Sequence, residues 1–298
     1  MNILLLGGSG YIGSKFISTY KDTYNITSID LNLFHESKES QQKNYKDVSL
    51  ENYDVILCLA GHSSVQMCEY SSGRSWVNNV DYFRELCDNL SNQKLIYASS
   101  ASVYGSGSAM SSENSPINFN PVCHYDLQKI TIDMIANKYI KEGKNIVGLR
   151  FGTVNGASPH TRRELMINSM VYNALTKRAI DAKNLHIRRA ILGINDLMRC
   201  LKVIVENDIQ HGQYNLSSFN STVEEIAKTV AKECSAQLII HPEDAVAYDF
   251  EMTTNKFEKE TGFIFTDTIQ QIVEGLKENY WNAIYTTRDH DGKFQEFM

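Results

Sequence analysis

Short apolar runs alternate with longer amphipathic segments through the first half of the chain. Several runs are apolar throughout, as in Val55-Ile-Leu-Cys-Leu-Ala60, which is typical of strands covered on both faces. We therefore expect strands at residues 2–6, 25–30, 54–59, 94–98 and 145–150, and helices at residues 11–20, 75–90 and 124–142. Such alternation predicts an α/β fold in which helices cover both faces of a parallel sheet. The polar link between Asp30 and Asp47 is short, so we expect only a loop or one helical turn there.

The alternation loosens after residue 150. We expect helices at residues 164–178, 195–206, 222–234 and 268–281, and strands at residues 185–188 and 213–216. The pattern predicts a doubly wound main domain at residues 1–154, to which the chain returns around residues 190–216. A smaller C-terminal domain would comprise residues 155–189 and 217–285, followed by a polar tail at residues 286–298.

Composition and charge narrow the class of protein. The 298 residues carry a formal net charge of −6 at pH 7, so no positive field attracts nucleic acid or an anionic membrane. The apolar run at the N-terminus is too short for a signal peptide or a membrane span, and we expect a cytoplasmic protein with no membrane partner. The six cysteines show no metal-type pairing, which predicts reduced thiols and no metal site.

Gly7, Gly10 and Gly13, spaced three residues apart, lie directly between the first expected strand and the first expected helix, in Gly7-Gly-Ser-Gly10-Tyr-Ile-Gly13. Glycines at this spacing allow a tight turn, close approach of the backbone to a pyrophosphate and close packing of helix on strand. An ordinary strand-to-helix turn can also contain glycines. Asp30 ends the second strand, where a carboxylate accepts hydrogen bonds from the ribose of adenosine and repels a 2′-phosphate. The glycine turn and Asp30 together predict a dinucleotide site that prefers NAD to NADP.

A second group of residues is suited to acid–base chemistry. Ser99 and Ser100 follow the fourth strand, and Tyr125 and Lys129 stand four residues apart on one face of a long helix. A neighbouring ammonium, helped by a positive nicotinamide, is expected to lower the pKa of the Tyr125 phenol, so that it exchanges a proton near neutral pH. Ser100 can hydrogen-bond the reacting oxygen. Because many surface helices carry Tyr and Lys at this spacing, the prediction depends on the glycine turn and Asp30 as well.

With these motifs the chain resembles the extended short-chain dehydrogenases/reductases, specifically their nucleotide-sugar epimerase/dehydratase family. The matching pieces are GGSGYIG, Asp30, Asp47-Val48, Leu59-Ala60-Gly61, Asn78-Asn-Val80, SSASVYG, YDLQK, LRFGTVNG and Arg189 with Asn195-Asp-Leu197. The resemblance implies a Rossmann-type fold, NAD as cofactor and catalysis by Ser100, Tyr125 and Lys129. The implied cofactor-binding residues are Gly7, Gly10, Tyr11, Ile12, Gly13, Asp30, Leu31, Asp47, Val48, Leu59, Ala60, Gly61, Asn78, Ser99, Tyr125, Lys129 and Phe151.

For the substrate the resemblance implies a nucleotide sugar held by the smaller, substrate-binding domain, with Arg189 on its diphosphate. The other implied substrate-binding residues are Ser64, Ser100, Thr153 and Asn168. Arg162, Arg163 and Arg188 could assist Arg189, but we interpret them as solvated surface charges.

Departures from the family pattern bear on the chemistry. Relatives that dehydrate or decarboxylate place an acidic residue just after the catalytic serine, where this chain has Ala101 and Ser102, so we do not expect elimination. Gly193 replaces a common His, and no second phosphate-binding Arg stands near Tyr248.

The resemblance favours an NAD-dependent 4-epimerase or 4-ketoreductase, in which Tyr125 is the base and the nicotinamide accepts hydride. One alternative is a dehydrogenase or reductase of a non-nucleotide carbonyl compound; another is a catalytically silent, cofactor-sensing protein. Cys123 and His124 are either loop residues or additional acid–base groups. The resemblance also suggests a homodimer formed through residues 75–90 and 124–142.

Overall fold

A seven-stranded sheet forms the centre of the protein in the computed structural model, which describes residues 1–32, 38–42, 45–107, 110–118, 120–243, 248–280 and 283–285. The strand order is β12-β7-β5-β4-β1-β2-β3, and every pair is parallel. The strands are β1 (Asn2–Leu6), β2 (Asn25–Asp30), β3 (Gln41–Gln42), β4 (Val55–Cys58), β5 (Lys94–Ser100), β7 (Ile146–Phe151) and β12 (Gly212–Leu216). The predicted doubly wound, Rossmann-type α/β fold is confirmed. Because the order reverses between β1 and β4, their carboxyl ends border the crevice in which such sheets bind ligands.

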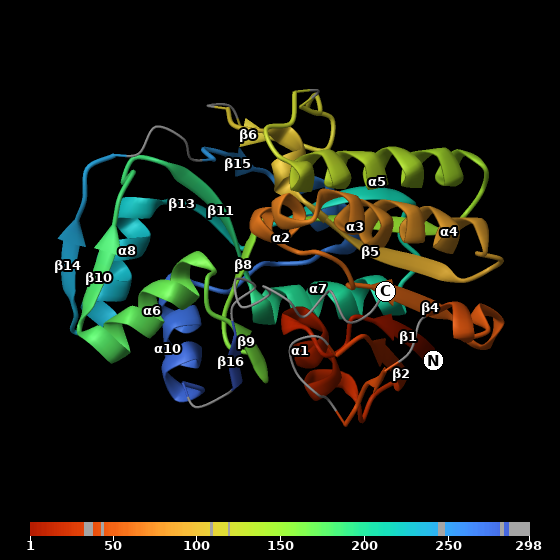
Figure 1. The fold of residues 1–298 in the computed structure, drawn as a ribbon, viewed down its shortest axis with the longest axis horizontal. Coiled ribbons are helices and arrows are strands. Elements are labelled where there is room, and N and C mark those ends of the chain that lie inside the picture. Colours follow the sequence, from red (N-terminus) through yellow and green to blue (C-terminus); the bar gives the residue numbers. More distant parts are fainter. Residues whose placement is uncertain are drawn as a thin grey trace.

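Helices cover both faces of this sheet (Figure 1). Ile3 and Leu5 of β1 pack into a core with α1 and α7, whereas Leu4 and Leu6 pack into a core with α4 and α5. Alternate residues of one strand point to opposite faces, which explains why the strands are apolar throughout. The helices of these layers are α1 (Tyr11–Tyr20), α2 (Val65–Tyr70), α3 (Ser72–Trp76), α4 (Tyr82–Asp88), α5 (His124–Lys141) and α7 (Ile194–Glu206).

A buried ion pair fixes α5 against the sheet. The Arg150 side chain at the end of β7 donates from Nε to Oδ2 of Asp133 on α5 over 2.8 Å, and both side chains are buried. The Tyr97 hydroxyl of β5 donates to the other Asp133 oxygen at 2.8 Å. Since Asp133 lies one turn beyond Lys129, this network holds the helix that carries Tyr125 and Lys129.

Smaller sheets and helices make up the rest of the described chain, and β10, β14, α6, α8 and α10 among them lie at the left of Figure 1. A separate apolar core lies among α6, α8 and α10. The strands are β6 (Met110–Ser111), β8 (Thr153–Asn155), β9 (His160–Arg162), β10 (Ala179–Ala182), β11 (Arg188–Gly193), β13 (Phe219–Thr222), β14 (Gln237–Ile240), β15 (Glu251–Met252) and β16 (Ala283–Tyr285). The helices are α6 (Met166–Lys177), α8 (Val223–Glu233), α9 (Asn255–Thr261) and α10 (Ile269–Glu278). The division into two domains stays a prediction, and the expected tail lies outside the described residues.

Two expected elements differ in the structure. The prediction of a strand at residues 185–188 is wrong. Asn184 has a positive φ of 53°, and the chain turns at residues 185–186, so that β11 begins only at Arg188. The expected helix at 75–90 is interrupted by a π-helical segment, Val77–Asp81, between α3 and α4. The described parts of the link between Asp30 and Asp47 contain the expected single helical turn, the 3₁₀ turn Tyr45–Asp47, and also the short strand β3, which was not expected.

No helix among the described residues is long and apolar enough to cross a membrane. All six cysteines are free thiols. The described part of the chain also contains no group of three or more His, Cys, Asp or Glu side chains that could hold a metal ion.

Candidate active site at the carboxyl edge of the sheet

The glycine turn between β1 and α1 is packed so closely that side chains are excluded at several positions, among them Gly7 and Gly13. Gly7 has a φ of +93°, and a Cβ there would lie 2.6 Å from the backbone nitrogen of Ala60. A Cβ at Gly13 would overlap the carbonyl oxygen of Gly7, so glycine is what lets α1 pack against the turn. At Gly10, by contrast, the nearest heavy atom to a Cβ would be 3.4 Å away. Gly10 therefore leaves room for a ligand to approach the backbone at the N-terminus of α1.

Asp30 lies at the other side of this turn. Its Oδ2 accepts a hydrogen bond from the Ser9 backbone N–H at 2.9 Å, and its Oδ1 accepts one from Asn32 at 2.8 Å. Burial raises the pKa of the Asp30 carboxyl, while these backbone donors lower it. The side chain is held at the end of β2, as the prediction for a ribose-binding carboxylate requires.

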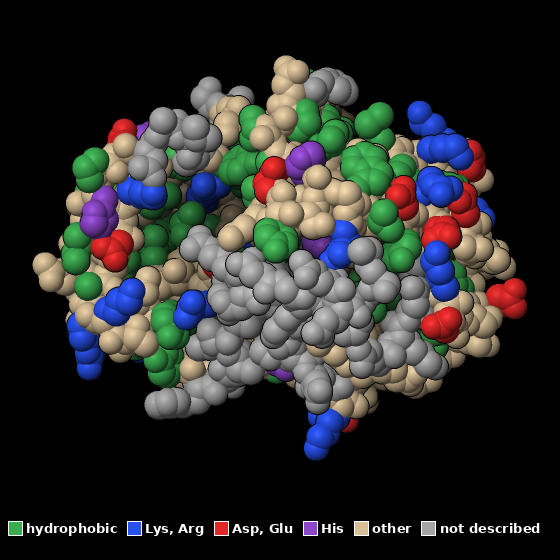
Figure 2. Space-filling view, in the orientation of Figure 1, with side chains coloured by type: hydrophobic (Ala, Val, Ile, Leu, Met, Phe, Trp, Pro, Cys, Tyr) green, Lys and Arg blue, Asp and Glu red, His purple; other side chains and the backbone are tan. Residues whose placement is uncertain are grey.

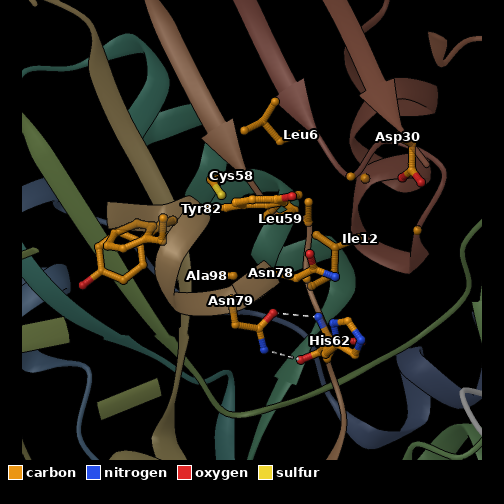
Figure 3. A pocket seen from close by; sticks show the side chains of 18 of the residues that line it. Leu6, Ile12, Asp30, Cys58, Leu59, His62, Asn78, Asn79, Tyr82 and Ala98 are labelled. Atoms are coloured by element: carbon orange, nitrogen blue, oxygen red, sulfur yellow. Dashed lines mark hydrogen bonds between the residues drawn. The ribbon is translucent and has the colours of Figure 1, made fainter. Parts of the chain in front are cut away.

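A cavity opens between the glycine turn and the carboxyl ends of β1, β4 and β5 (Figure 3). Most of the predicted cofactor-binding residues line it: Gly7, Gly10, Tyr11, Ile12, Gly13, Asp30, Leu31, Leu59, Ala60, Gly61, Asn78 and Lys129. Other residues line it as well that were not predicted to bind the cofactor, among them Ser63, Asn79, Tyr82 and Arg162. The structure thus brings segments from residue 6 to residue 162 around one cavity.

Asn79 holds the loop that follows β4. Its Oδ1 accepts a hydrogen bond from the His62 backbone N–H at 2.8 Å, and its Nδ2 donates to the His62 carbonyl oxygen at 3.0 Å (Figure 3). The same Nδ2 donates to Gln128 Oε1 on α5 at 2.7 Å. The prediction chose Asn78 from the Asn-Asn pair; both side chains line the cavity, and Asn79 also connects the loop to α5. The π-helical segment brings both to the same wall, a feature often found at functional sites.

Ser100, Tyr125 and Lys129 meet beside this cavity. Ser100 is the last residue of β5, and its Oγ accepts a hydrogen bond from the Ser102 backbone N–H at 3.2 Å. The Lys129 ammonium lies 5.6 Å from the centre of the Tyr125 ring and donates to the Ala98 carbonyl oxygen at 2.7 Å. A phenol, an ammonium and a hydroxyl at the edge of a cofactor-sized cavity can transfer a proton to or from a bound alcohol or carbonyl.

The predicted lowering of the Tyr125 pKa is not found in the chain itself. Burial raises the pKa of the phenol to about 12, while a hydrogen bond with Ser100 and the charge of Arg162 act in the opposite direction. Burial also lowers the pKa of Lys129. The prediction considered the nearby ammonium and omitted the cost of desolvating a phenolate.

Arg189 is a half-buried cation that forms no ion pair with a described residue. Its guanidinium lies 6.0 Å from the centre of the Tyr248 ring and 5.7 Å from that of Phe250. Its Nε makes no hydrogen bond to the described part of the protein, and burial lowers its pKa. A half-buried guanidinium with a buried, unused Nε donor is suited to bind an anion.

The other arginines named from the sequence are not simple surface charges. Arg188 forms ion pairs with Asp249 and Glu251 at 3.1 and 3.0 Å. Arg163 lies over the ring of Tyr172, 4.9 Å from its centre. The side chain of Arg162 is only 12% exposed and lines the cavity, so the interpretation of Arg162 as solvated is wrong.

Besides Ser100 and Tyr125, which lie beside the cavity, several predicted site residues are not part of the described cavity lining. They are Asp47 and Val48 around the 3₁₀ turn after β3, Ser64 at the N-cap of α2, Ser99 in β5, Phe151 at the end of β7, Thr153 in β8, Asn168 in α6 and Arg189 in β11. Asn168 is buried, with its Oδ1 accepting from the Gly156 N–H at 2.9 Å and its Nδ2 donating to the Arg162 carbonyl at 2.9 Å. The glycine at position 193 is explained by close packing, because a Cβ there would overlap the Asp267 side chain. That side chain accepts a hydrogen bond from the Asp196 backbone N–H at the start of α7.

The parallel sheet, the glycine turn, Asp30 and the cavity at the strand switch point define a dinucleotide-binding α/β protein. Residues 3–217 match the model of the NAD dependent epimerase/dehydratase family. The chain therefore belongs to this family of NAD-dependent enzymes, as the motifs predicted.

Named relatives are distant. The chain is 26% identical over 273 residues to an ADP-L-glycero-D-manno-heptose-6-epimerase of Brachyspira hyodysenteriae, covering 81% of this chain and 85% of the relative. It is 26% identical to Protein CapI of Staphylococcus aureus over 69% of this chain and 70% of the relative. A UDP-glucuronic acid 4-epimerase from Bacillus cereus, solved with UDP-glucuronic acid and NAD, shares the fold at a TM-score of 0.79, with 18% identity and 100% of both chains covered. The NAD complex of a dTDP-glucose 4,6-dehydratase from Bacillus anthracis shares the fold at a TM-score of 0.78, with 22% identity and coverage of 94% of this chain and 98% of that chain.

Proposed function

We propose that this enzyme acts on a nucleotide sugar as a 4-epimerase or 4-ketoreductase, interconverting a ring hydroxyl and a ketone. The observation that carries the proposal is the meeting of Ser100, Tyr125 and Lys129 beside the NAD cavity. The names of the relatives, which include sugar epimerases, support the sugar as substrate class. The presence of all three residues argues against a catalytically silent protein.

Tyr125 takes the proton of the sugar hydroxyl during oxidation and returns one during reduction. Ser100 orients the reacting oxygen through its hydroxyl, and Lys129, held by the Ala98 carbonyl, supplies positive charge beside the phenol. Bound NAD supplies the acceptor and donor of hydride. The glycine turn and Asp30 fit this cofactor, because Gly10 leaves its approach open and the Asp30 carboxylate lines the cavity at the end of β2.

Arg189 is the proposed partner of the substrate diphosphate. Its guanidinium is half-buried beside two aromatic rings, and its Nε is buried and makes no hydrogen bond to any described residue. The Asp249 carboxylate only partly offsets the cost of burying this cation, and an anionic substrate would relieve the rest. A non-nucleotide carbonyl substrate would leave Arg189 without this role.

The surroundings of Ala101 favour epimerisation or reduction over elimination. Ala101 is buried in an apolar cluster with Ala190, Phe250 and Met252. An acidic residue at this position, as elimination chemistry would use, would be desolvated among apolar side chains. The described members of the cluster around Ala101 are all apolar and include no carboxylate.

We also propose that the enzyme is a homodimer formed through the α2–α5 surface. Hydrophobic side chains gather over α5 and the neighbouring helices in Figure 2. Exposed apolar residues on these elements include Tyr70, Val77, Leu127 and Met134. Contiguous exposed apolar surface is typical of protein–protein contacts.

The test is incubation of the purified enzyme with NAD or NADH and a panel of UDP-, dTDP-, GDP- and CDP-sugars. An isomerised sugar without net change of cofactor identifies an epimerase, and stoichiometric NADH consumption with a 4-keto sugar identifies a ketoreductase. If no nucleotide sugar binds or reacts, and a simple carbonyl compound does, the proposal is wrong.

Tyr125→Phe removes the proton-transferring hydroxyl and should lower turnover by about 10²- to 10⁴-fold. NAD affinity should change little, because the change removes one oxygen beside the cavity. Tyr53→Phe is the matched control, since Tyr53 lies outside both the cavity lining and the proposed dimer surface, and it should retain full activity. Retained turnover in Tyr125→Phe would contradict the assignment of the base.

A further inference from the structure

The segment at residues 158–162 is attached to the glycine turn. The Ser158 hydroxyl donates to the Tyr11 carbonyl oxygen at 2.7 Å and lies 2.9 Å from Ser14 Oγ. His160 Nδ1 lies 2.6 Å from the Ser9 carbonyl oxygen and donates to it. These contacts join residues about 150 positions apart, and Figure 1 shows β9 beside α1. The segment therefore runs next to the helix N-terminus at which a dinucleotide pyrophosphate binds.

Arg162 ends this segment and connects it to the loop after β4. Its Nη1 donates to the carbonyl oxygen and to Oγ of Ser63, at 3.1 and 3.2 Å. Its Nε donates to Glu164 Oε1 at 2.6 Å, which fixes the plane of the guanidinium. Since two residues span at most about 7 Å, Arg162 lies close to His160. The segment thus bridges the loops that follow β1 and β4, the two strands between which the strand order of the sheet reverses.

The charges around the cavity make Arg162 distinctive. Among the described lining residues the Lys and Arg side chains are Lys129 and Arg162, and the carboxylate is Asp30. Lys129 donates to the Ala98 carbonyl beside Tyr125. Arg162 uses Nε and Nη1 within the protein, but its Nη2 makes no hydrogen bond to any described residue. Arg162 therefore presents unused, charged donors at the edge of a dinucleotide cavity.

We propose that Arg162 binds the pyrophosphate of NAD through Nη2 and that residues 158–162 form a strap that retains the cofactor during turnover. The backbone of Arg162 is held by Asn168, whose Nδ2 donates to its carbonyl oxygen at 2.9 Å. The strap gives the pyrophosphate a charged partner opposite the glycine turn. Slow release of NAD suits an epimerase, because a ketoreductase must exchange its cofactor at every turnover.

The test is the affinity and dissociation rate of NAD in the protein freed of cofactor, measured by calorimetry and by stopped-flow fluorescence. Arg162→Met should weaken NAD binding about 10- to 100-fold, the range expected for hydrogen bonds to a charged group, mainly through faster dissociation. Arg163→Met is the matched control, because it removes the same charge at a neighbouring residue that lies over Tyr172. It should leave NAD affinity within about twofold.

Arg162→Lys provides a second variant that keeps the charge and the aliphatic stem. A lysine cannot hold Ser63 and the pyrophosphate together, so its NAD affinity should lie between those of the wild type and Arg162→Met. Wild-type affinity in both Arg162 variants, or an equal loss in Arg163→Met, would overturn the proposal. These measurements need no sugar, so a failure of the proposed substrate would leave their outcome unchanged.

Discussion

Tyr125 shows how opposing local effects set the chemistry of one residue. Burial favours its neutral phenol and raises the pKa to about 12, whereas the hydrogen bond with Ser100 and the charge of Arg162 favour the phenolate. The neutral form therefore dominates at neutral pH in the protein without cofactor. A positive nicotinamide nearby would add to the effects that lower the pKa.

The titration of Tyr125 can be measured directly. The tyrosinate absorbance of the cofactor-free wild type minus that of Tyr125→Phe should show no step at the ordinary value near 10 and should rise only toward pH 12. Adding NAD should move the rise to lower pH, because the positive ring favours the phenolate. A step at or below about pH 10 without cofactor would contradict the dominance of burial.

At the scale of elements, the glycine turn and α1 form one packed unit. Gly13 stands inside α1, where glycine ordinarily destabilises a helix by about 0.5–1 kcal/mol relative to alanine. It is retained here because any Cβ would overlap the Gly7 carbonyl oxygen. Gly275 in α10 is also helical, but a Cβ there would meet no atom within 4 Å.

These two glycines make a matched pair of substitutions. Gly13→Ala should destabilise the protein by about 1–3 kcal/mol, as overpacking does, and weaken NAD binding by displacing the turn. Gly275→Ala should instead stabilise it by about 0.5–1 kcal/mol. Urea unfolding and NAD binding of both variants measure the difference, and equal stability changes of the same sign would refute this account of the turn.

At the scale of the whole molecule, the proposed dimer surface lies on the helices that also carry the catalytic residues. Leu127 and Met134 are seven residues apart on α5, hence on one face, and are 38% and 57% exposed. Tyr125 and Lys129 belong to the same helix. A dimer through this face would hold α5 from its outer side, while the Asp133–Arg150 pair holds it from within.

Met134→Glu should break this dimer, because it places a charge at the centre of an apolar contact. Light scattering should then give the mass of one chain instead of two. Ile264→Glu is the control, as Ile264 is 73% exposed and outside α2–α5. A wild-type protein that is monomeric at micromolar concentration would remove the basis for the dimer.

The sequence by itself determined the elements and motifs whose signal is local. The bounds of β1, β2 and α1 match the expected ones, because apolar periodicity and the glycine turn lie within a few residues of each other. The spacing of Tyr125 and Lys129 likewise required only helical geometry. These features were sufficient to predict the parallel sheet, NAD and the three candidate catalytic residues.

Tertiary structure decided what depends on contacts between distant segments. Arg162 is held by hydrogen bonds to Ser63 and Glu164, and Asn79 by hydrogen bonds to His62 and Gln128. At the start of β11, Arg188 forms ion pairs with Asp249 and Glu251, and Arg189 lies beside two aromatic rings. No local pattern distinguishes a solvated arginine from one that a distant strand buries. The electrostatics of the site belong to the folded molecule for the same reason: desolvation and charge partners exist only after the chain has brought its segments together.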